Sequence, residues 1–221
     1  MTDVLYRWPP AAEFNRRIPK DRFYGRGTTN AAVKDRCVEE VARITWAYKL
    51  ATATINLPDS EDVPEIQVFE VVAKAENVSD QVLAAIDKAI PSPILYEVIR
   101  DHDGRRETRL VAAHKQLGHG APKISGYFTT GWLPPDTERQ RLPTAITLPD
   151  LYSALLTPLT DVQIRSGEDM EDVADRLRTV SRLERQVKTL ERKIRTEKQL
   201  NRRVELNRSL KITRAELDKQ R

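Results

Sequence analysis

Apolar residues recur at heptad spacing near the end of the chain, and this pattern constrains the fold more than any other feature of the sequence. Alternating steps of three and four residues keep the side chains of a series on one face of a helix, which then packs against another helix. The series consists of Val173, Leu177, Val180, Leu183, Val187, Leu190 and Ile194. Beyond Gly167 no aromatic residue occurs. We therefore predict a long packed helix in this part of the chain.

The heptad series stops near Thr196, because its continuation would place Glu197 and Asn201 in the apolar stripe. A second set of apolar residues follows another phase: Leu200, Val204, Leu206, Leu210 and Leu217. The change of phase predicts that the helix is interrupted between the two sets.

A capping box fits this interruption, since Thr196 is followed by Gln199. In such a box the threonine hydroxyl accepts a hydrogen bond from the glutamine backbone N–H, and the glutamine side chain reaches back. We predict two helices, at about 170–195 and 199–219, that form an antiparallel hairpin. One bent, continuous helix is the alternative.

Charge is distributed unevenly along the chain. Residues 176–221 contain 16 Lys or Arg and 6 Asp or Glu, a net charge of +10, whereas residues 1–175 contain 21 and 27, a net charge of −6. We predict an acidic α+β body at residues 1–165 and a basic helical hairpin at residues 168–221. Such asymmetry bears on binding partners rather than on the fold.

The basic side chains of the predicted hairpin are the candidates for contacting nucleic acid or a protein partner. They can neutralise phosphates, but the segment has no aromatic side chain to stack on bases. Basic side chains also flank ordinary coiled coils without any binding role. We favour docking on protein, with nucleic-acid binding as the alternative. The candidates are Arg192, Lys193, Arg195, Lys198, Arg202, Arg203, Arg208, Lys211 and Arg214.

Short strand and helix patterns fill the body. Strand patterns occupy residues 44–57, as one extended strand or two short ones, and residues 65–76, 94–99, 108–114 and 123–132. Helical patterns occupy residues 31–43, 79–90 and 148–159. This order predicts an α+β fold with a mixed or antiparallel sheet and packed helices, in which the first two strands are neighbours. The segment before Thr28 is rich in proline and glycine breaks and is expected to wrap the body.

Size and composition exclude several classes of protein. A chain of 221 residues with 39% hydrophobic residues can bury a genuine core. No apolar run approaches the roughly 20 residues of a membrane helix, and no secretory signal is visible, so we expect a cytoplasmic protein without membrane contact. The single cysteine, Cys37, lies in an apolar helical series and is expected to be a buried thiol.

Catalytic motifs are weak. Glu65, Glu70 and Lys74 faintly resemble the acidic and lysine residues of restriction-type nucleases, but Glu70 and Lys74 are four residues apart where that motif needs two. We keep the three residues only as weak nuclease candidates. The histidines and Cys37 show no metal-ligand spacing. We therefore predict no metal site and no cofactor.

Three segments together resemble a bacterial family of about this chain's length that is classified only as a domain of unknown function. They are IPKDRFYGRGTTNAAVKDRCVEEVARITWAYKLATATINL, VFEVVAKAENVSDQVLAAIDKAIPSPILYEV and LERKIRTEKQLNRRVEL. Members of that family tend to be encoded beside DNA methyltransferases and helicases, in loci that look like restriction-modification or phage-defence systems. Related sequences often have a proline near position 199 or 200, where this chain has none, so a continuous helix stays an alternative.

The resemblance implies an accessory or adaptor protein of such a system and brings no catalytic residues with it. We predict a non-enzymatic protein whose basic hairpin docks on a helicase or DNA methyltransferase of the same locus. Direct nucleic-acid binding is the alternative, and a degenerate metal-dependent nuclease is a weaker one. A heptad seam pairs equally well within a hairpin, with a second copy of the chain or with a foreign helix, so a homo-oligomer stays open.

Overall fold

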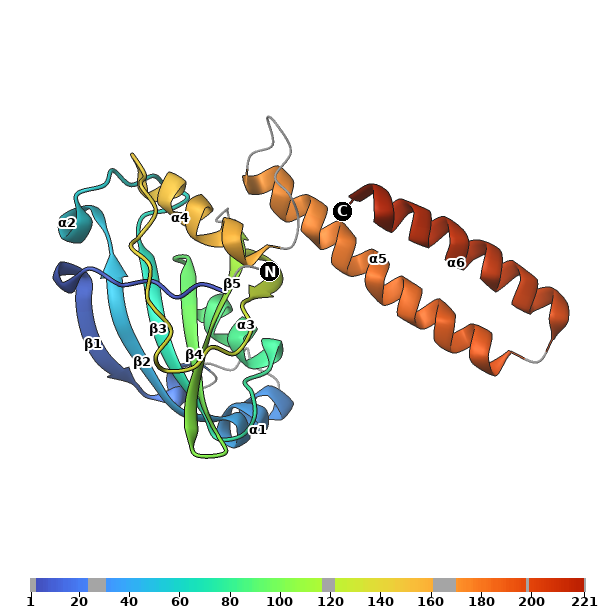
Figure 1. Cartoon of the computed structure of the whole chain (residues 1–221), viewed down its shortest axis with the longest axis horizontal. Coiled ribbons are helices and arrows are strands. Elements are labelled where there is room, and N and C mark those ends of the chain that lie inside the picture. Colours follow the sequence, from blue (N-terminus) through green and yellow to red (C-terminus); the bar gives the residue numbers. More distant parts are fainter. Residues whose placement is uncertain (1–2, 24–30, 117–121, 161–169, 198, 221) are drawn as a thin grey trace. The chain divides into compact units, whose positions relative to one another are not determined.

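A six-stranded mixed sheet forms the centre of the first of two units (Figure 1). The units are Met1–Asp161 and Val162–Arg221. The computed structural model describes residues 3–23, 31–116, 122–160, 170–197 and 199–220. None of the helices in these ranges combines the length and the apolar composition needed to cross a membrane.

The strands lie side by side in the order in which the chain visits them. They are β1 (Glu13–Ile18), β2 (Val41–Leu50), β3 (Ile66–Ala73), β4 (Ile94–His102), β5 (Arg105–Gln116) and β6 (Lys123–Thr129). Neighbours are antiparallel except β3 and β4, which are parallel and are connected through α3 (Asp80–Ala89). A parallel pair requires such a crossover. The predicted α+β class is confirmed, and its first two predicted strands are neighbours.

One face of the sheet is covered by α1 (Ala31–Glu40) and α3, which lie on the same side of it (Figure 1). The apolar stripe predicted for α3 packs into this core, where Leu83 and Ile86 are fully buried. Burial of each such side chain stabilises the fold by about 1.5–3 kcal/mol. Cys37 of α1 is buried in the same core, as predicted.

The opposite face of the sheet is covered by the N-terminal segment and by α4 (Leu148–Leu156). Successive side chains of a strand point to opposite faces, so Glu97 of β4 points away from the α3 core. Trp8 of the N-terminal segment donates a hydrogen bond to Glu97 on this face, and Tyr152 of α4 stacks on His114 of β5. The two faces are thus both covered, which explains why most residues of the central strands β3 and β4 are buried.

A capping box begins α4. The Thr147 side chain accepts from the Asp150 backbone N–H at 3.2 Å, and the Asp150 carboxylate accepts from the Thr147 N–H at 3.1 Å. The predicted helix start at residue 148 is therefore correct, and the box satisfies two otherwise unpaired N–H groups there.

Two predicted boundaries of β2 are wrong. The preceding helix ends at Glu40 instead of reaching Arg43, because Val41 pairs with Ala73 and is fully buried in the sheet. The strand ends at Leu50 instead of continuing to residue 57. There a short helix, α2 (Thr52–Ile55), forms instead. Sheet pairing overrides local helical propensity at the start of the strand, whereas at its end the pairing with β3 stops at Leu50.

The opening segment was expected only to wrap the body, but it also contributes the edge strand β1. Every β1 residue from Glu13 to Arg17 is exposed, so the segment carries little apolar alternation of its own. Its pairing with β2 is interrupted by an irregularity between Glu13 and Arg16, where Asn15 has a positive φ of 45°. The helix cap predicted at residues 28–30 lies outside the described residues.

Two antiparallel helices form the described part of the second unit: α5 (Met170–Thr196) and α6 (Leu200–Gln220) (Figure 1). The interruption near Thr196 is therefore confirmed, and one continuous helix is excluded. The predicted capping box is wrong, because the Thr196 hydroxyl donates backwards to the carbonyls of Arg192 and Lys193. The Gln199 backbone N–H instead donates to the Glu197 carboxylate at 2.9 Å.

Candidate docking surface

The apolar seam of the hairpin is closed at one end and open at the other. Val180, Leu183 and Leu217 are buried together, with Val187 packed against them. Towards the turn between the helices the seam residues are only half-buried: Leu190, Ile194, Leu206 and Leu210. Near the turn the two helices do not enclose the seam from every side, so part of each of these four side chains faces the flank of the pair. The side chains of Val173 and Leu177 lie outside the described part of the chain.

Contacts at both ends of α5 fix the antiparallel register of the hairpin. The guanidinium of Arg176 donates to the backbone carbonyl of Gln220 at 3.1 Å. Nearer the turn, Arg214 forms a salt bridge with Glu191 at 2.7 Å. Both partners of that pair are substantially exposed, so it contributes little to stability. The register depends mainly on the buried end of the seam.

A hollow runs along one flank of the hairpin, and we call it the basic groove. Two adjoining depressions that share Lys193 form it. Arg182, Lys193 and Arg202 are exposed on it and form no salt bridge within the described part of the chain. The lining consists of Arg182, Arg185, Gln186, Thr189, Leu190, Lys193, Thr196, Glu197, Arg202, Glu205, Leu206, Ser209 and Thr213. The groove is therefore lined by more positive than negative side chains, by hydroxyl groups and by two leucines, Leu190 and Leu206.

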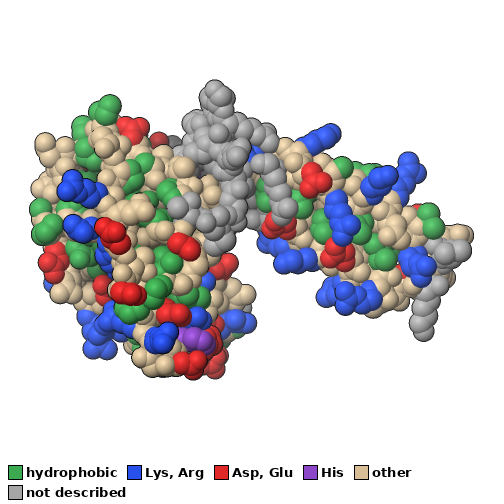
Figure 2. Space-filling view, viewed as in Figure 1, with side chains coloured by type: hydrophobic (Ala, Val, Ile, Leu, Met, Phe, Trp, Pro, Cys, Tyr) green, Lys and Arg blue, Asp and Glu red, His purple; other side chains and the backbone are tan. Residues whose placement is uncertain are grey.

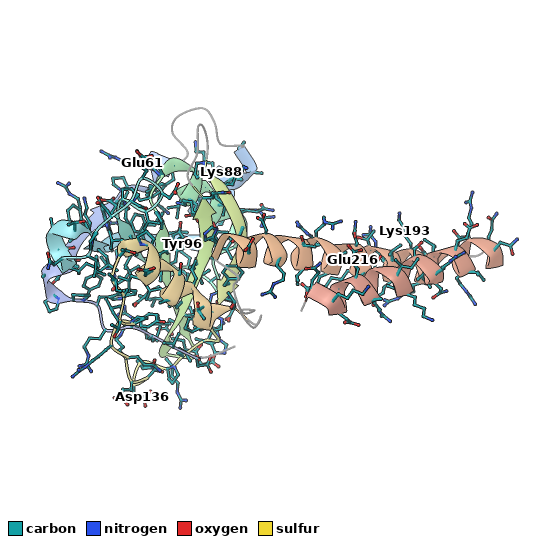
Figure 3. All side chains as sticks on the ribbon, turned by 90° about the horizontal axis from the view of Figure 1, so that it is seen from above. Glu61, Lys88, Tyr96, Asp136, Lys193 and Glu216 are labelled. Carbon is teal, nitrogen blue, oxygen red and sulfur yellow. The ribbon has the colours of Figure 1, made fainter. Side chains whose placement is uncertain are left out.

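The structure divides the predicted binding residues among several surfaces of the hairpin. Lys193 and Arg202 line the basic groove, and Figure 3 labels Lys193 on α5. Lys211 and Arg214 line a separate hollow on α6. The remaining described candidates are exposed elsewhere on the helices: Arg192, Arg195, Arg203 and Arg208. Lys198 lies outside the described residues. Figure 2 shows Lys and Arg spread over the visible face of the hairpin.

The sequence interpretation missed two groove residues, Arg182 and Arg185. For Arg182 a usable signal was present, because it begins a series of five groove-lining residues that are spaced four, three, four and three positions apart along α5. They are Arg182, Gln186, Thr189, Lys193 and Thr196. This polar series runs parallel to the apolar seam, so the same heptad periodicity that predicts the seam also predicts its flank.

The three weak nuclease candidates do not meet. Glu65 precedes β3 and forms a salt bridge with Lys49 at 2.7 Å. Lys74 follows the strand, and its ammonium donates to the carbonyl of Val38. An extended chain rises about 3.3 Å per residue, so about 30 Å separates the two backbones. Glu70 lies between them. No group of three or more potential metal-binding His, Cys, Asp or Glu residues occurs in the described part of the chain.

A family model described as "Domain of unknown function (DUF4391)" matches residues 7–217. The chain belongs to this family. The DUF4391 match covers both units, from β1 through nearly all of α6, so the hairpin is part of the family domain. Neither a curated protein nor a solved structure matches the chain.

A buried ion pair holds the end of α3 in this DUF4391 domain. The Lys115 ammonium lies 2.7 Å from the Asp87 carboxylate, and both side chains are almost fully buried. The ammonium also donates to the carbonyls of Asp87, Ile90 and Ser92, and a cation is favoured at such a helix C-terminus. Burial lowers the pKa of Lys115, and the Asp87 charge opposes this shift. The hydroxyl of Tyr127 donates to the same carboxylate. Every ammonium hydrogen is engaged, which indicates a structural role.

A second buried carboxylate lies on the opposite face of the DUF4391 sheet. Arg139 donates to both oxygens of Glu97, at 2.7 and 2.8 Å, and the Trp8 indole N–H donates at 2.6 Å. The hydrogen bond with Glu97 raises the pKa of Arg139. This arrangement ties the N-terminal segment and the loop before α4 to β4. The sequence offered no signal for it, because the three residues are far apart in the chain.

The thiol and the two described histidines lack the surroundings of reactive groups. Burial raises the pKa of Cys37, so the thiol is not activated as a nucleophile. His102 is exposed and lies 3.2 Å from Glu76. His114 is half-buried against Tyr152, and His119 lies outside the described residues. Of the described polar surfaces in this DUF4391 protein, the hairpin therefore offers the clearest candidate for binding.

Proposed function

We propose that this protein is a non-catalytic accessory or adaptor subunit whose basic α5–α6 hairpin docks on a protein partner. The observation that carries the proposal is the incomplete hairpin. Its seam is half-exposed towards the turn, and Arg182, Lys193 and Arg202 have no salt-bridge partner within the described part of the chain. A partner surface that supplies apolar and acidic side chains would complete both features.

The identity of the partner follows from the family resemblance rather than from the fold. Because similar sequences tend to be encoded beside DNA methyltransferases and helicases, we propose that the partner is one of these proteins in a bacterial DNA-modification or phage-defence system. The heptad spacing of the seam supports packing of the hairpin as an antiparallel coiled coil, which presents both flanks to a partner.

Affinity purification from the native host, with neighbouring genes intact, tests the proposal. The tagged full-length chain is compared with a chain that ends at Gly167, and mass spectrometry quantifies the co-purifying proteins. We expect the helicase or methyltransferase to be lost with the shortened chain, whose sheet unit should keep its thermal transition. Retention of the same partners by the shortened chain would contradict docking through the hairpin.

A charge-reversal series locates the docking surface. Arg182→Glu, Lys193→Glu and Arg202→Glu together reverse the three groove cations that form no salt bridge within the described part of the chain. The matched control, Lys188→Glu, Arg192→Glu and Arg203→Glu, makes the same change of charge at exposed residues that do not line it. We expect the groove variant to lose partner binding by about tenfold or more relative to the control. Equal losses would indicate attraction by net charge alone.

Direct nucleic-acid binding is the second candidate, and the composition of the basic groove favours it. Gln186, Thr189 and Ser209 line the groove beside its cations, and these side-chain types also contact phosphates. The measurement is fluorescence anisotropy with duplex and single-stranded DNA over a range of salt concentrations. Phosphate neutralisation requires that affinity fall linearly with salt on logarithmic axes. Binding that is absent, or that is insensitive to salt, removes this candidate.

A further inference from the structure

The second helix of the hairpin carries a stripe of side chains opposite its seam. Ile212 follows Leu210 by two residues, and 100° per residue places the two side chains about 200° apart around α6. Val204 and Leu206 have the same relation. Val204 and Ile212 are each 61% exposed, whereas Leu206 and Leu210 are half-buried against α5. We call this surface the outer stripe. It consists of Val204, Arg208, Lys211, Ile212 and Ala215, all exposed.

The spacing within the outer stripe is that of a helix–helix contact. Its apolar residues lie at positions i, i+8 and i+11, with Arg208 at i+4 and Lys211 at i+7, and this spacing puts all five on one face of α6, as in a helix that packs on a partner. Single exposed apolar residues are ordinary. Here, however, two large β-branched side chains share one face of α6 with a small residue, Ala215. The apolar residues of α6 are therefore divided between two faces, the seam and the outer stripe.

Charge selects the kind of partner that fits the outer stripe. Arg208 and Lys211 lie between the two apolar side chains, and the stripe contains no acidic residue. Neither cation forms a salt bridge within the described part of the chain. A second copy of α6 would bring like charges together, which is unfavourable. Phosphates would pair with the cations but would leave Val204 and Ile212 without apolar contact. An acidic amphipathic helix satisfies both kinds of side chain.

We propose that the outer stripe of α6 docks an acidic amphipathic helix of the partner protein. The inference rests on the proposed docking function and adds to it a second contact face, on α6, and the kind of partner helix that fits this face. Val204 and Ile212 insert between the apolar side chains of the incoming helix, and Arg208 and Lys211 pair with its carboxylates. The stripe spans about three helical turns, so a short partner helix is sufficient.

A synthetic peptide tests the inference on the full-length chain. The probe is a labelled three-heptad peptide with leucine at its core positions and glutamate at the flanking positions, and binding is followed by fluorescence anisotropy. Two control peptides have lysine in place of glutamate, or the same composition in scrambled order. We expect binding of the acidic heptad peptide only, because the scrambled peptide has the charge without the apolar face.

The decisive variant is Val204→Ala with Ile212→Ala. Alanine has a higher helix propensity than valine or isoleucine, so α6 is not weakened and circular dichroism should be unchanged. We expect the peptide to bind about tenfold more weakly or worse, because most of the apolar contact is removed. The matched control is Val38→Ala with Ile146→Ala, which truncates two exposed apolar residues elsewhere and should leave binding unchanged.

Several outcomes would overturn the inference. Equal binding of the acidic peptide by the Val204/Ile212 variant, or equal binding of the scrambled peptide, would show attraction by charge alone. Binding of duplex DNA that is unaffected by the same variant but abolished by Arg208→Ala with Lys211→Ala would identify nucleic acid as the occupant. Dimerisation of the wild-type chain that the Val204/Ile212 variant abolishes, measured by sedimentation, would identify a second copy.

The native-host purification separates this inference from the proposed function. If the chain that ends at Gly167 loses the partner while the Val204/Ile212 variant keeps it, the hairpin docks through another face and only the outer stripe is wrong. If the shortened chain keeps the partner, the docking function fails as well. Loss of the partner in both variants, with the Val38/Ile146 control intact, supports both.

Discussion

The sheet unit and the hairpin differ in how they treat their polar and apolar groups. In the sheet unit both faces are covered, and the buried charges of Lys115 and Glu97 have full sets of partners. In the hairpin the seam is half-exposed near the turn, and several cations are unpaired within the described part of the chain. This difference is the reason for proposing the hairpin, rather than the sheet unit, as the part that binds a partner.

Removal of one member of the buried ion pair should have the largest effect. Asp87→Ala leaves the Lys115 ammonium buried without its carboxylate, and we expect a loss of about 3–5 kcal/mol in the free energy of unfolding. Chemical denaturation followed by tryptophan fluorescence reports this loss, because all tryptophans lie in the sheet unit. A loss below about 1 kcal/mol would mean that water or a neighbouring group replaces the carboxylate.

The two ends of the hairpin seam should respond differently to truncation. Leu183 is 1% exposed, so we expect Leu183→Ala to destabilise the hairpin by about 2–4 kcal/mol. Leu190→Ala, at the half-buried end, should cost only about 1 kcal/mol because less surface is lost. Hydrogen exchange of α5 and α6 measures both changes. Equal effects would show that the open end of the seam is as well packed as the closed end.

Alkaline pH should destabilise the sheet unit selectively. Burial raises the pKa of Tyr6 from 10 to about 12. The neutral phenol is therefore favoured in the folded state, so its contribution is complete below pH 10 and is lost as the pH rises towards 12. This single residue accounts for up to about 2–3 kcal/mol. Thermal melts across this range should decline less steeply for Tyr6→Phe, and a decline of unchanged steepness would contradict the assignment.

The smallest effect is expected at the surface pair of the hairpin. Glu191→Ala removes the salt bridge with Arg214, in which both side chains are substantially exposed, and should cost less than about 1 kcal/mol. Added salt should diminish even this small difference. A loss as large as that of Asp87→Ala would show that the contact also fixes the packing of α5 on α6.

Local patterns were sufficient for most elements of the fold. The stripe of α3 and the phase change near Thr196 both depend on residues a few positions apart, so periodicity alone predicts them. The edge strand β1 was missed because its residues are exposed and acquire their conformation by pairing with β2. The helix predicted to reach Arg43 was too long because Val41 is recruited into the sheet.

The candidate site was predictable only in part, because the grouping of its residues depends on tertiary packing rather than on local sequence. Lys193 and Arg202 were predicted as binding residues from composition, but only the packed pair of helices shows that they line one groove. Glu65 and Lys74 looked like members of one motif, yet the length of β3 holds them apart. Composition gives the number of charges, and packing decides which of them share a surface.

The sequence by itself determined that basic helices follow an α+β body in this protein, because heptad spacing and charge are local properties of the chain. The choice between a hairpin and one continuous helix needed the tertiary structure. The tertiary structure alone decided which groups are satisfied. The pairing of Lys115 with Asp87 and of Arg139 with Glu97 joins segments far apart in sequence. Such contacts depend on sheet topology. In the same way, the exposure of Val204 and Ile212 depends on how α6 packs against α5.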